Sequence, residues 1–237
     1  MAFPDFAAGA MENWGLVTYR ERVLLFNEKL YTPLQKQYVA TVVAHELAHQ
    51  WFGNLVTMKW WNDLWLNEGF ATLMEYAGVD AIDPNYKMED YFLLDALDNA
   101  LARDAMATSH PLSFPILKAE DVSEAFDQIS YDKGASVMRM LRTVLGETNI
   151  YLTKHAYSNA EHTDLWKALT EVVPDNLTSW NGDKFDVDDF AKKWTEQMGF
   201  PVITVSTTSK GVQLTQKRFK MDENAVESSR FKNAKFW

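Results

Sequence analysis

The sequence predicts a mainly α fold, and three features of its pattern carry that prediction. Between residues 33 and 198, apolar residues recur at the three- and four-residue spacing of helices. Stretches typical of strands lie towards the two ends of the chain. Turn-forming residues such as Asp83-Pro84 separate the helical stretches. We therefore expect a helical domain with a short β segment at its N-terminus and further strands at its C-terminus.

The first third of the chain contains two helices that are central to the prediction of a site. Residues 14–26 mix β-branched and aromatic residues and are typical of strand and turn. Pro33 suits the first position of a helix, so we predict a helix over residues 33–52. Val39, Val42, Val43 and Leu47 recur at helical spacing, so we expect these apolar residues to hold the helix in a core. A second helix is predicted over residues 63–78, ending at Gly78.

The rest of the chain adds more helices and ends in a hairpin. The predicted helical ranges are 83–103, 123–145, 151–173 and 186–198. The composition changes at Gly199-Phe200-Pro201. Two alternating segments, 202–206 and 212–216, flank Ser209-Lys210-Gly211, an arrangement that predicts a β-hairpin.

The composition excludes several classes of function. The chain has 237 residues, 47% of them hydrophobic, so it can bury a sizeable core. Its net charge is −10 with no basic cluster, which argues against a nucleic-acid partner. It has no cysteine, so disulfides and thiol chemistry are excluded. We find no apolar run of about eighteen residues, which is the approximate length of a membrane span, and no signal peptide.

A metal site is predicted by the pattern His-Glu-x-x-His that begins at His45. His45 and His49 are four residues apart, so on a helix both imidazoles leave the same face and can reach one ion. A catalytic zinc site normally takes three protein ligands and leaves a fourth position to water. A third ligand is therefore needed, and a metal-free relic of such a site is the main alternative.

The third ligand is predicted to be a glutamate from the second helix. The metzincin pattern would require glycine and histidine where this chain has Phe52 and Leu55. Glu68 instead follows His49 after eighteen residues, which is enough chain to end one helix, turn at Gly53-Asn54 and begin another. The predicted ligands of one Zn²⁺ ion per chain are His45, His49 and Glu68. Cobalt or manganese could occupy the same ligands in vitro.

Glu46 lies between the two histidines and is the candidate general base. Its carboxylate would accept a proton from the attacking water and pass it to the leaving amine. The roles of other polar residues are less specific. Glu75 lies seven residues after Glu68 on the same helix face, so it would either orient a ligand or be solvated. Three further histidines lack ligand spacing and are expected to be structural or exposed: His110, His155 and His162.

Two more motifs accompany the metal motif, and together the three motifs resemble those of a known family. Gly9-Ala10-Met11-Glu12-Asn13 precedes the metal motif, and Tyr131-Asp132-Lys133-Gly134-Ala135 follows it. With all three motifs in order, the sequence resembles the gluzincin zinc aminopeptidases of the aminopeptidase N type from Pro4 to about Val205. Within that family it is similar to membrane-bound aminopeptidase N enzymes, including nematode gut forms.

The resemblance implies an architecture and a location. The expected units are a thermolysin-like catalytic domain over residues 1–199, truncated at its N-terminal side, and the beginning of an incomplete β-sandwich domain over residues 200–237. Similar enzymes are several times longer, and a homodimer would form through domains that are absent here. The implied location is the plasma membrane, with an extracellular catalytic domain; the alternative is cytoplasmic. Asn176-Leu177-Thr178 fits an N-glycosylation acceptor.

The resemblance also assigns roles to individual residues. By analogy, the Tyr131 hydroxyl stabilises the oxyanion that forms during catalysis. Glu12 would pair with the free α-amino group of a peptide, whose pKa of about 7.7–8.0 leaves it largely protonated at neutral pH. The substrate-binding residues implied by the motif are Gly9, Ala10, Met11, Glu12 and Asn13, with Met11 lining the first side-chain pocket.

The expected function is that of a zinc-dependent aminopeptidase acting on peptides with a free N-terminus. Two alternatives remain open: a thermolysin-like endopeptidase, which would not need Glu12, and a catalytically silent binding or antigenic fragment. One departure from the family pattern lies between Gly146 and Tyr151, where the chain is short by about seven residues, or roughly two helical turns.

Overall fold

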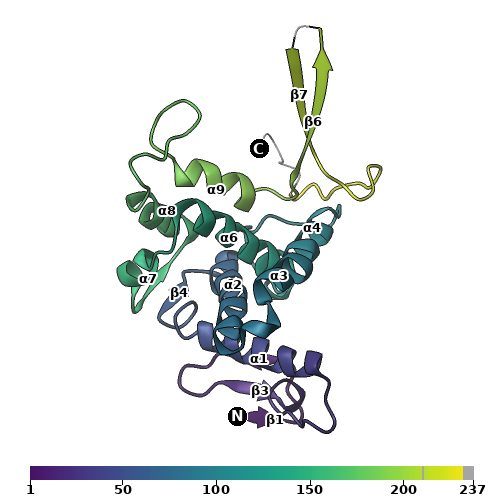
Figure 1. Ribbon diagram of the computed structural model, residues 1–237, viewed down its shortest axis with the longest axis vertical. Coiled ribbons are helices and arrows are strands. Elements are labelled where there is room, and N and C mark those ends of the chain that lie inside the picture. Colours follow the sequence, from purple (N-terminus) through teal and green to yellow (C-terminus); the bar gives the residue numbers. More distant parts are fainter. Residues whose placement is uncertain (210, 232–237) are drawn as a thin grey trace.

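The computed structural model describes residues 1–209 and 211–231, and helices dominate it (Figure 1). The α-helices are α1 (Pro33–Ala48), α2 (Trp65–Ile82), α3 (Met88–Phe92), α4 (Asp98–Asp104), α5 (Ala119–Val122), α6 (Gly134–Leu145), α7 (Ile150–His155), α8 (His162–Glu171) and α9 (Val187–Thr195). The 3₁₀ or π-helical turns are η1 (Glu21–Val23), η2 (Trp61–Asp63), η3 (Pro84–Tyr86), η4 (Leu93–Leu97), η5 (Ser123–Ala125) and η6 (Ile129–Lys133). The strands are β1 (Ala2–Phe3), β2 (Ala10–Met11), β3 (Thr18–Arg20), β4 (Val56–Met58), β5 (Ser158–Ala160), β6 (Pro201–Thr208) and β7 (Gly211–Arg218). The prediction of a mainly α fold is confirmed.

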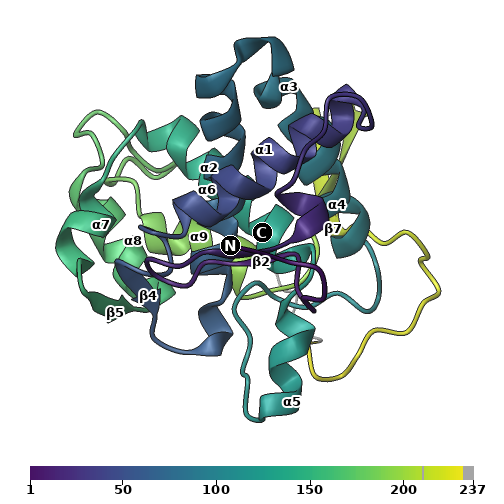
Figure 2. The ribbon, with the colours of Figure 1, turned by 90° about the horizontal axis from the view of Figure 1, so that it is seen from below.

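Helix α2 lies in the middle of the helical body, with α1 packed on one side and α6 on the other (Figures 1 and 2). A three-stranded sheet of order β1-β3-β2 lies beside α1, where β2 runs antiparallel to β3. The main core is formed between α2, α6 and α8, and it includes the fully buried indoles of Trp65 and Trp166, whose ring centroids are 5.7 Å apart. The site residues on α1 and α2 are thus held by a buried scaffold. No helix in the described ranges is both long and apolar enough to cross a membrane.

Helix α1 begins as predicted and packs differently from the prediction. Thr32 and Gln35 form a capping box around Pro33, which satisfies the first free backbone N–H groups. The expectation that Leu47 lies in the core is wrong, since its side chain is 52% exposed. The buried residues of α1 are instead Gln37, which donates a hydrogen bond to Sδ of Met88, and Glu46.

Helix α2 continues four residues beyond the predicted end at Gly78. Gly78 lies within the helix, at the contact between α2 and α1. A Cβ atom at this position would lie 3.2 Å from the Cβ of Ala44, which is tighter than usual. The glycine therefore allows the two site helices to approach each other closely.

Three of the predicted helices are divided in the structure. The range 83–103 is interrupted at Lys87, which has a left-handed φ of 52°, and contains the π-helical turn η4. The range 151–173 is split because Tyr157 adopts a left-handed φ of 62° and β5 pairs in parallel with the distant strand β4. The range 123–145 is split into η5, η6 and α6, and the π-helical turn η6 contains Tyr131. Near the predicted shortening, α7 has only six residues.

The β6–β7 hairpin projects from the helical body, at the end opposite the N-terminal sheet (Figure 1). The hairpin prediction is confirmed, with Val205 opposite Leu214 in the register. Lys210, in the predicted turn, and residues 232–237 lie outside the described residues. The larger β-sandwich stays a prediction.

Candidate metal centre

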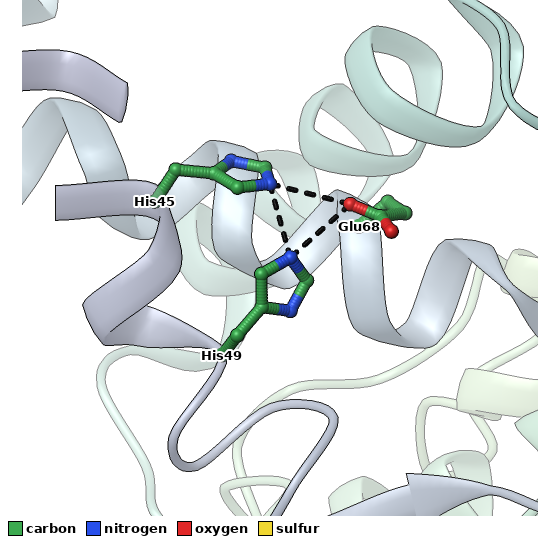
Figure 3. A group of neighbouring side chains, drawn as sticks. All are labelled: His45, His49 and Glu68. Carbon is green, nitrogen blue, oxygen red and sulfur yellow. Dashed lines mark hydrogen bonds and ion pairs between the residues drawn. The ribbon is translucent and has the colours of Figure 1, made fainter. Parts of the chain in front are cut away.

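The metal motif lies at the C-terminal end of α1 and in the turn that follows it. His45 is in the last turn of the helix, and His49 is its C-cap residue with right-handed helical angles. The spacing of four residues is therefore helical, and the two Nε2 atoms lie 3.0 Å apart (Figure 3). His49 is fully buried and the His45 side chain is 12% exposed.

Glu68 reaches the same point from the first turn of α2. Its Oε2 atom lies 3.2 Å from Nε2 of His45 and 3.2 Å from Nε2 of His49 (Figure 3). The three donor atoms all lie within 4.8 Å of one another, so one ion could contact all of them. The structure thus brings together the three residues that the sequence predicted as metal ligands.

Both histidines are oriented by contacts on the ring nitrogen that faces away from the cluster. Nδ1 of His49 lies 2.8 Å from the carbonyl oxygen of Phe52, which can only accept a hydrogen bond. Nδ1 of His45 lies 2.7 Å from Oε2 of Glu75. With Nδ1 as the donor, Nε2 is the nitrogen available to a metal. Of the two roles left open for Glu75, the observed contact fits orientation of a ligand.

Gly53 is required by the turn that follows the second histidine. Its φ of +131° is unfavourable for residues with a side chain, and a Cβ atom would lie 3.2 Å from Nδ1 of His49. The glycine therefore lets the chain turn back tightly against the histidine ring.

The charges of the cluster suit a cation. Burial raises the pKa of Glu68, but its contacts with His45 and His49 outweigh it and bring this pKa to about 2. Burial lowers the pKa of His45, yet its contacts with Glu68 and Glu75 raise it well above the usual value. Glu68 is thus negatively charged at neutral pH, and its surroundings favour positive charge. The nitrogen and carboxylate donors are those that zinc prefers.

Glu46 lies buried beside the cluster. No hydrogen-bond partner for its Oε2 atom is found among the described residues. Burial is the main cause that raises the pKa of Glu46 to about 7, and the charges of His45 and His49 act against it. A buried carboxylate with a pKa near neutrality can accept and release protons.

Tyr131 also faces the cluster. Its ring lies nearly parallel to that of His45, with 5.9 Å between centroids and an angle of 9° between planes. Burial, then the charge of Glu68 and a hydrogen bond with Glu68, raise the pKa of Tyr131 far above its usual value. The hydroxyl therefore keeps its proton and can donate a hydrogen bond.

The N-terminal motif lies against the turn after α1. The carbonyl oxygen of Glu12 accepts hydrogen bonds from Nδ2 of Asn54 at 2.8 Å and from Nε2 of Gln50 at 3.3 Å. These contacts bring Oε1 of Glu12 to 3.9 Å from Nδ1 of His49. Glu12 is therefore close to the cluster, although 33 residues separate it from His45 in the sequence.

The other residues of this motif are less tightly held. Ala10 and Met11 form β2, and the Met11 side chain is exposed. Asn13 donates a hydrogen bond from Nδ2 to Thr18. A Cβ atom at Gly9 would have no neighbour within 4 Å in the described structure. The segment thus presents open backbone and the Met11 side chain next to Glu12.

The remaining histidines lie outside the cluster. His162 pairs with buried Asp63, His110 contacts Asp127, and His155 packs beside Tyr151. The N–H group of Tyr131 donates a hydrogen bond to the carbonyl oxygen of Asp127 at 3.2 Å, and no local sequence pattern predicted this contact. For Glu75 the spacing of seven residues from Glu68 was the available signal.

A helical domain with a His-Glu-x-x-His and Glu cluster is the architecture of a metallopeptidase. Residues 1–194 match the peptidase family M1 domain, and the chain belongs to this family of peptidases. The resemblance to enzymes of the aminopeptidase N type is confirmed by the relatives described next.

Three relatives show how the match is distributed. Aminopeptidase N of Haemonchus contortus is 52% identical over 244 residues, covering 100% of this chain and 25% of the relative. Aminopeptidase N of Homo sapiens is 48% identical over 242 residues, covering 98% of the chain and 24% of the relative. Aminopeptidase M1-C of Oryza sativa subsp. japonica is 50% identical over 225 residues, covering 92% of the chain and 24% of the relative. The chain thus spans about a quarter of the length of these curated relatives.

Proposed function

We propose that this chain contains the catalytic centre of a zinc-dependent aminopeptidase that hydrolyses the N-terminal peptide bond of peptides. The observation that carries the proposal is the convergence of His45, His49 and Glu68 beside the buried carboxylate of Glu46, whose Oε2 atom has no hydrogen-bond partner among the described residues. Membership of peptidase family M1 supports the same class of reaction. The names of the relatives support an aminopeptidase over an endopeptidase.

The three converging residues would hold the zinc ion through Nε2 of each histidine and Oε2 of Glu68. When bound, zinc supplies a Lewis acid that polarises the substrate carbonyl and lowers the pKa of a water ligand to about 7. Glu75 and the Phe52 carbonyl keep both imidazoles in the orientation that this binding needs.

Glu46 would act as the general base. Its carboxylate accepts a proton from the attacking water and later donates it to the nitrogen of the leaving group. The burial of Glu46 and the absence of a partner for Oε2 within the described structure support this role. So does its pKa, which burial raises to about 7.

Tyr131 would donate a hydrogen bond to the oxyanion that develops on the substrate carbonyl. This role is supported by the position of its ring against His45 and by a pKa that keeps the hydroxyl protonated. The hydrogen bond to Glu68 would then be exchanged for one to the substrate.

Glu12 would select substrates with a free α-amino group. A carboxylate close to the metal ligands can pair with that group only when it belongs to the first residue of a peptide. The contact region would be completed by Gly9, Ala10, Met11 and Asn13, with Met11 towards the first side chain of the substrate.

Further proposals concern the whole protein. The catalytic domain would comprise residues 1–199, and residues 200–237 would begin a β-sandwich domain. The enzyme would act outside the cell at the plasma membrane and would be glycosylated; Asn176 lies exposed in a turn, which suits an acceptor. Any homodimer would form through parts of the protein other than this chain.

The test is hydrolysis of two leucyl anilides by the full-length protein, one with a free amine and one acetylated. We expect zinc-dependent cleavage of the free amine alone. Cleavage of both substrates would favour an endopeptidase and remove the role of Glu12. Cleavage of neither, with zinc bound, would contradict the proposal and leave a binding module as the better account.

A further inference from the structure

The π-helical turn η6 is held at both of its ends by two consecutive residues of α4. At the beginning, Nη2 of Arg103 lies 3.1 Å from Oδ2 of Asp127. At the end, Nζ of Lys133 lies 2.8 Å from Oδ2 of Asp104. Asp127 lies two residues before the turn and Lys133 is its last residue, so the C-terminal end of α4 contacts the chain on both sides of Tyr131.

Asp127 connects Arg103 to the backbone of the turn. Its Oδ1 atom accepts hydrogen bonds from the N–H groups of Ile129 at 2.9 Å and Ser130 at 3.4 Å. Its carbonyl oxygen accepts from the N–H group of Tyr131 at 3.2 Å. A π-helical turn is rare and is found mostly at functional sites. The ion pair with Arg103, together with the contact of His110, therefore holds a residue that bonds directly to three successive residues of this turn.

The far end of the turn is fixed in the interior. Lys133 and Asp104 are both buried, and Oδ1 of Asp104 also accepts hydrogen bonds from Oγ of Ser109 at 2.6 Å and from the N–H group of Gly199 at 2.7 Å. Lys133 donates a further hydrogen bond to the carbonyl oxygen of Gln197 at 3.4 Å. A fully hydrogen-bonded buried ion pair has little freedom to move.

We propose that Arg103 and Asp104 are positioning residues that fix the Tyr131 hydroxyl over the metal centre. This inference rests on the proposed function, in which Tyr131 donates a hydrogen bond to the oxyanion. Neither α4 residue contacts the metal ligands; both act through the turn. Since a displacement of about 1 Å at a reacting group can lower the rate by about a hundredfold, support at both ends of the turn matters for turnover.

The test uses Arg103→Gln in the full-length protein, because the Arg103–Asp127 pair is partly exposed and its loss is better tolerated than loss of the buried pair. Arg142→Gln is the matched control. The two arginine side chains are 23% and 25% exposed, and each forms an ion pair with a carboxylate. We expect kcat to fall by about ten- to a hundredfold in Arg103→Gln, with KM and zinc content unchanged. We expect wild-type kcat in Arg142→Gln and largely restored kcat in Arg103→Lys.

A double-mutant cycle separates positioning from a general loss of structure. In a Tyr131→Phe background, Arg103→Gln should lower kcat no further, because the hydroxyl that it positions is already absent. Asp127→Asn, with Asp186→Asn at the start of α9 as its control, provides a second variant for the same cycle.

The outcomes separate this inference from the proposed function. If Tyr131→Phe lowers kcat and the Arg103→Gln and Asp127→Asn effects are fully additive to it, the inference is wrong while the proposed function stands. The same conclusion follows if neither variant differs in kcat from its control. If Tyr131→Phe leaves kcat unchanged, the proposed role of Tyr131 is wrong, and the inference is wrong with it.

Discussion

Gly69 on α2 lies directly against Gly134 at the start of α6, so closely that a Cβ atom on Gly69 would be 2.9 Å from the Gly134 backbone. The first glycine follows Glu68, and the second follows Lys133 in the segment that contains Tyr131. The contact between these two backbones therefore influences the distance between Glu68, a proposed metal ligand, and Tyr131, the proposed oxyanion donor.

Gly69→Ala is expected to destabilise the protein and to weaken zinc binding. The new methyl group would meet backbone atoms, which cannot rotate away, so the cost should be at least about 1–3 kcal/mol. Gly78→Ala on the same helix is the comparison, and we expect it to be less destabilising. Its methyl group would lie 3.2 Å from the Cβ atom of Ala44 rather than 2.9 Å from backbone atoms, and alanine favours helix by about 0.5–1 kcal/mol. The measurements are urea unfolding and zinc content. Equal unfolding midpoints for the two variants would contradict this account of the contact.

The ion pair between Asp63 and His162 should make stability depend on pH. Burial raises the pKa of Asp63, but hydrogen bonding to His162 outweighs it and lowers this pKa; burial lowers the pKa of His162, but Asp63 raises it. The contribution of Asp63 is complete above about pH 4 and is lost as pH falls below that value through its lowered pKa. That of His162 is complete below about pH 6.5 and is lost as pH rises through its raised pKa.

Asp63→Asn should therefore cost most between about pH 4 and 6.5, on the order of 1–3 kcal/mol, and less at about pH 9. Urea unfolding of the wild type and the variant at several pH values measures this difference. Asp164→Asn is the control on α8, since Asp164 is more exposed and pairs with Lys167. A difference between wild type and Asp63→Asn that grows steadily with pH would contradict the assignment.

A contact of the site could be predicted from the sequence when the residues that form it are close together in the chain. His45 and His49 were found from sequence because four-residue spacing on one helix fixes their relation. The prediction of Glu68 as the third ligand required only that a second helix follow the turn after His49. The position of Tyr131 was not predictable from the sequence pattern, because it depends on the π-helical turn and on ion pairs with α4, more than twenty residues away. Likewise, the parallel pairing of β5 with distant β4 divides the helix predicted over 151–173.

Glu46→Gln is expected to lower kcat by about 10²–10⁴-fold while zinc content stays unchanged, because the amide cannot accept the proton from water. The pH profile gives a second readout. Burial raises the pKa of Glu46 to about 7, and a bound dication would lower it again. The acidic limb of kcat/KM should therefore lie below about pH 7. Loss of zinc in Glu46→Gln, or an acidic limb above that pH, would contradict the role as general base.

Glu12→Gln tests the selection of a free amine. An amide keeps the shape of the side chain but cannot form an ion pair with an α-ammonium group, and a hydrogen bond to a charged group contributes about 1.5–3 kcal/mol. We expect kcat/KM for the free-amine anilide to fall by about ten- to a hundredfold, while cleavage of the acetylated anilide stays negligible. The backbone contacts of Glu12 with Gln50 and Asn54 are retained, so zinc content should not change.

The control is Glu28→Gln. Glu28 is an exposed residue in the loop before α1, and this variant should have wild-type kinetics. Equal kcat/KM values for Glu12→Gln and Glu28→Gln would show that the selection of a terminal amine lies with another residue.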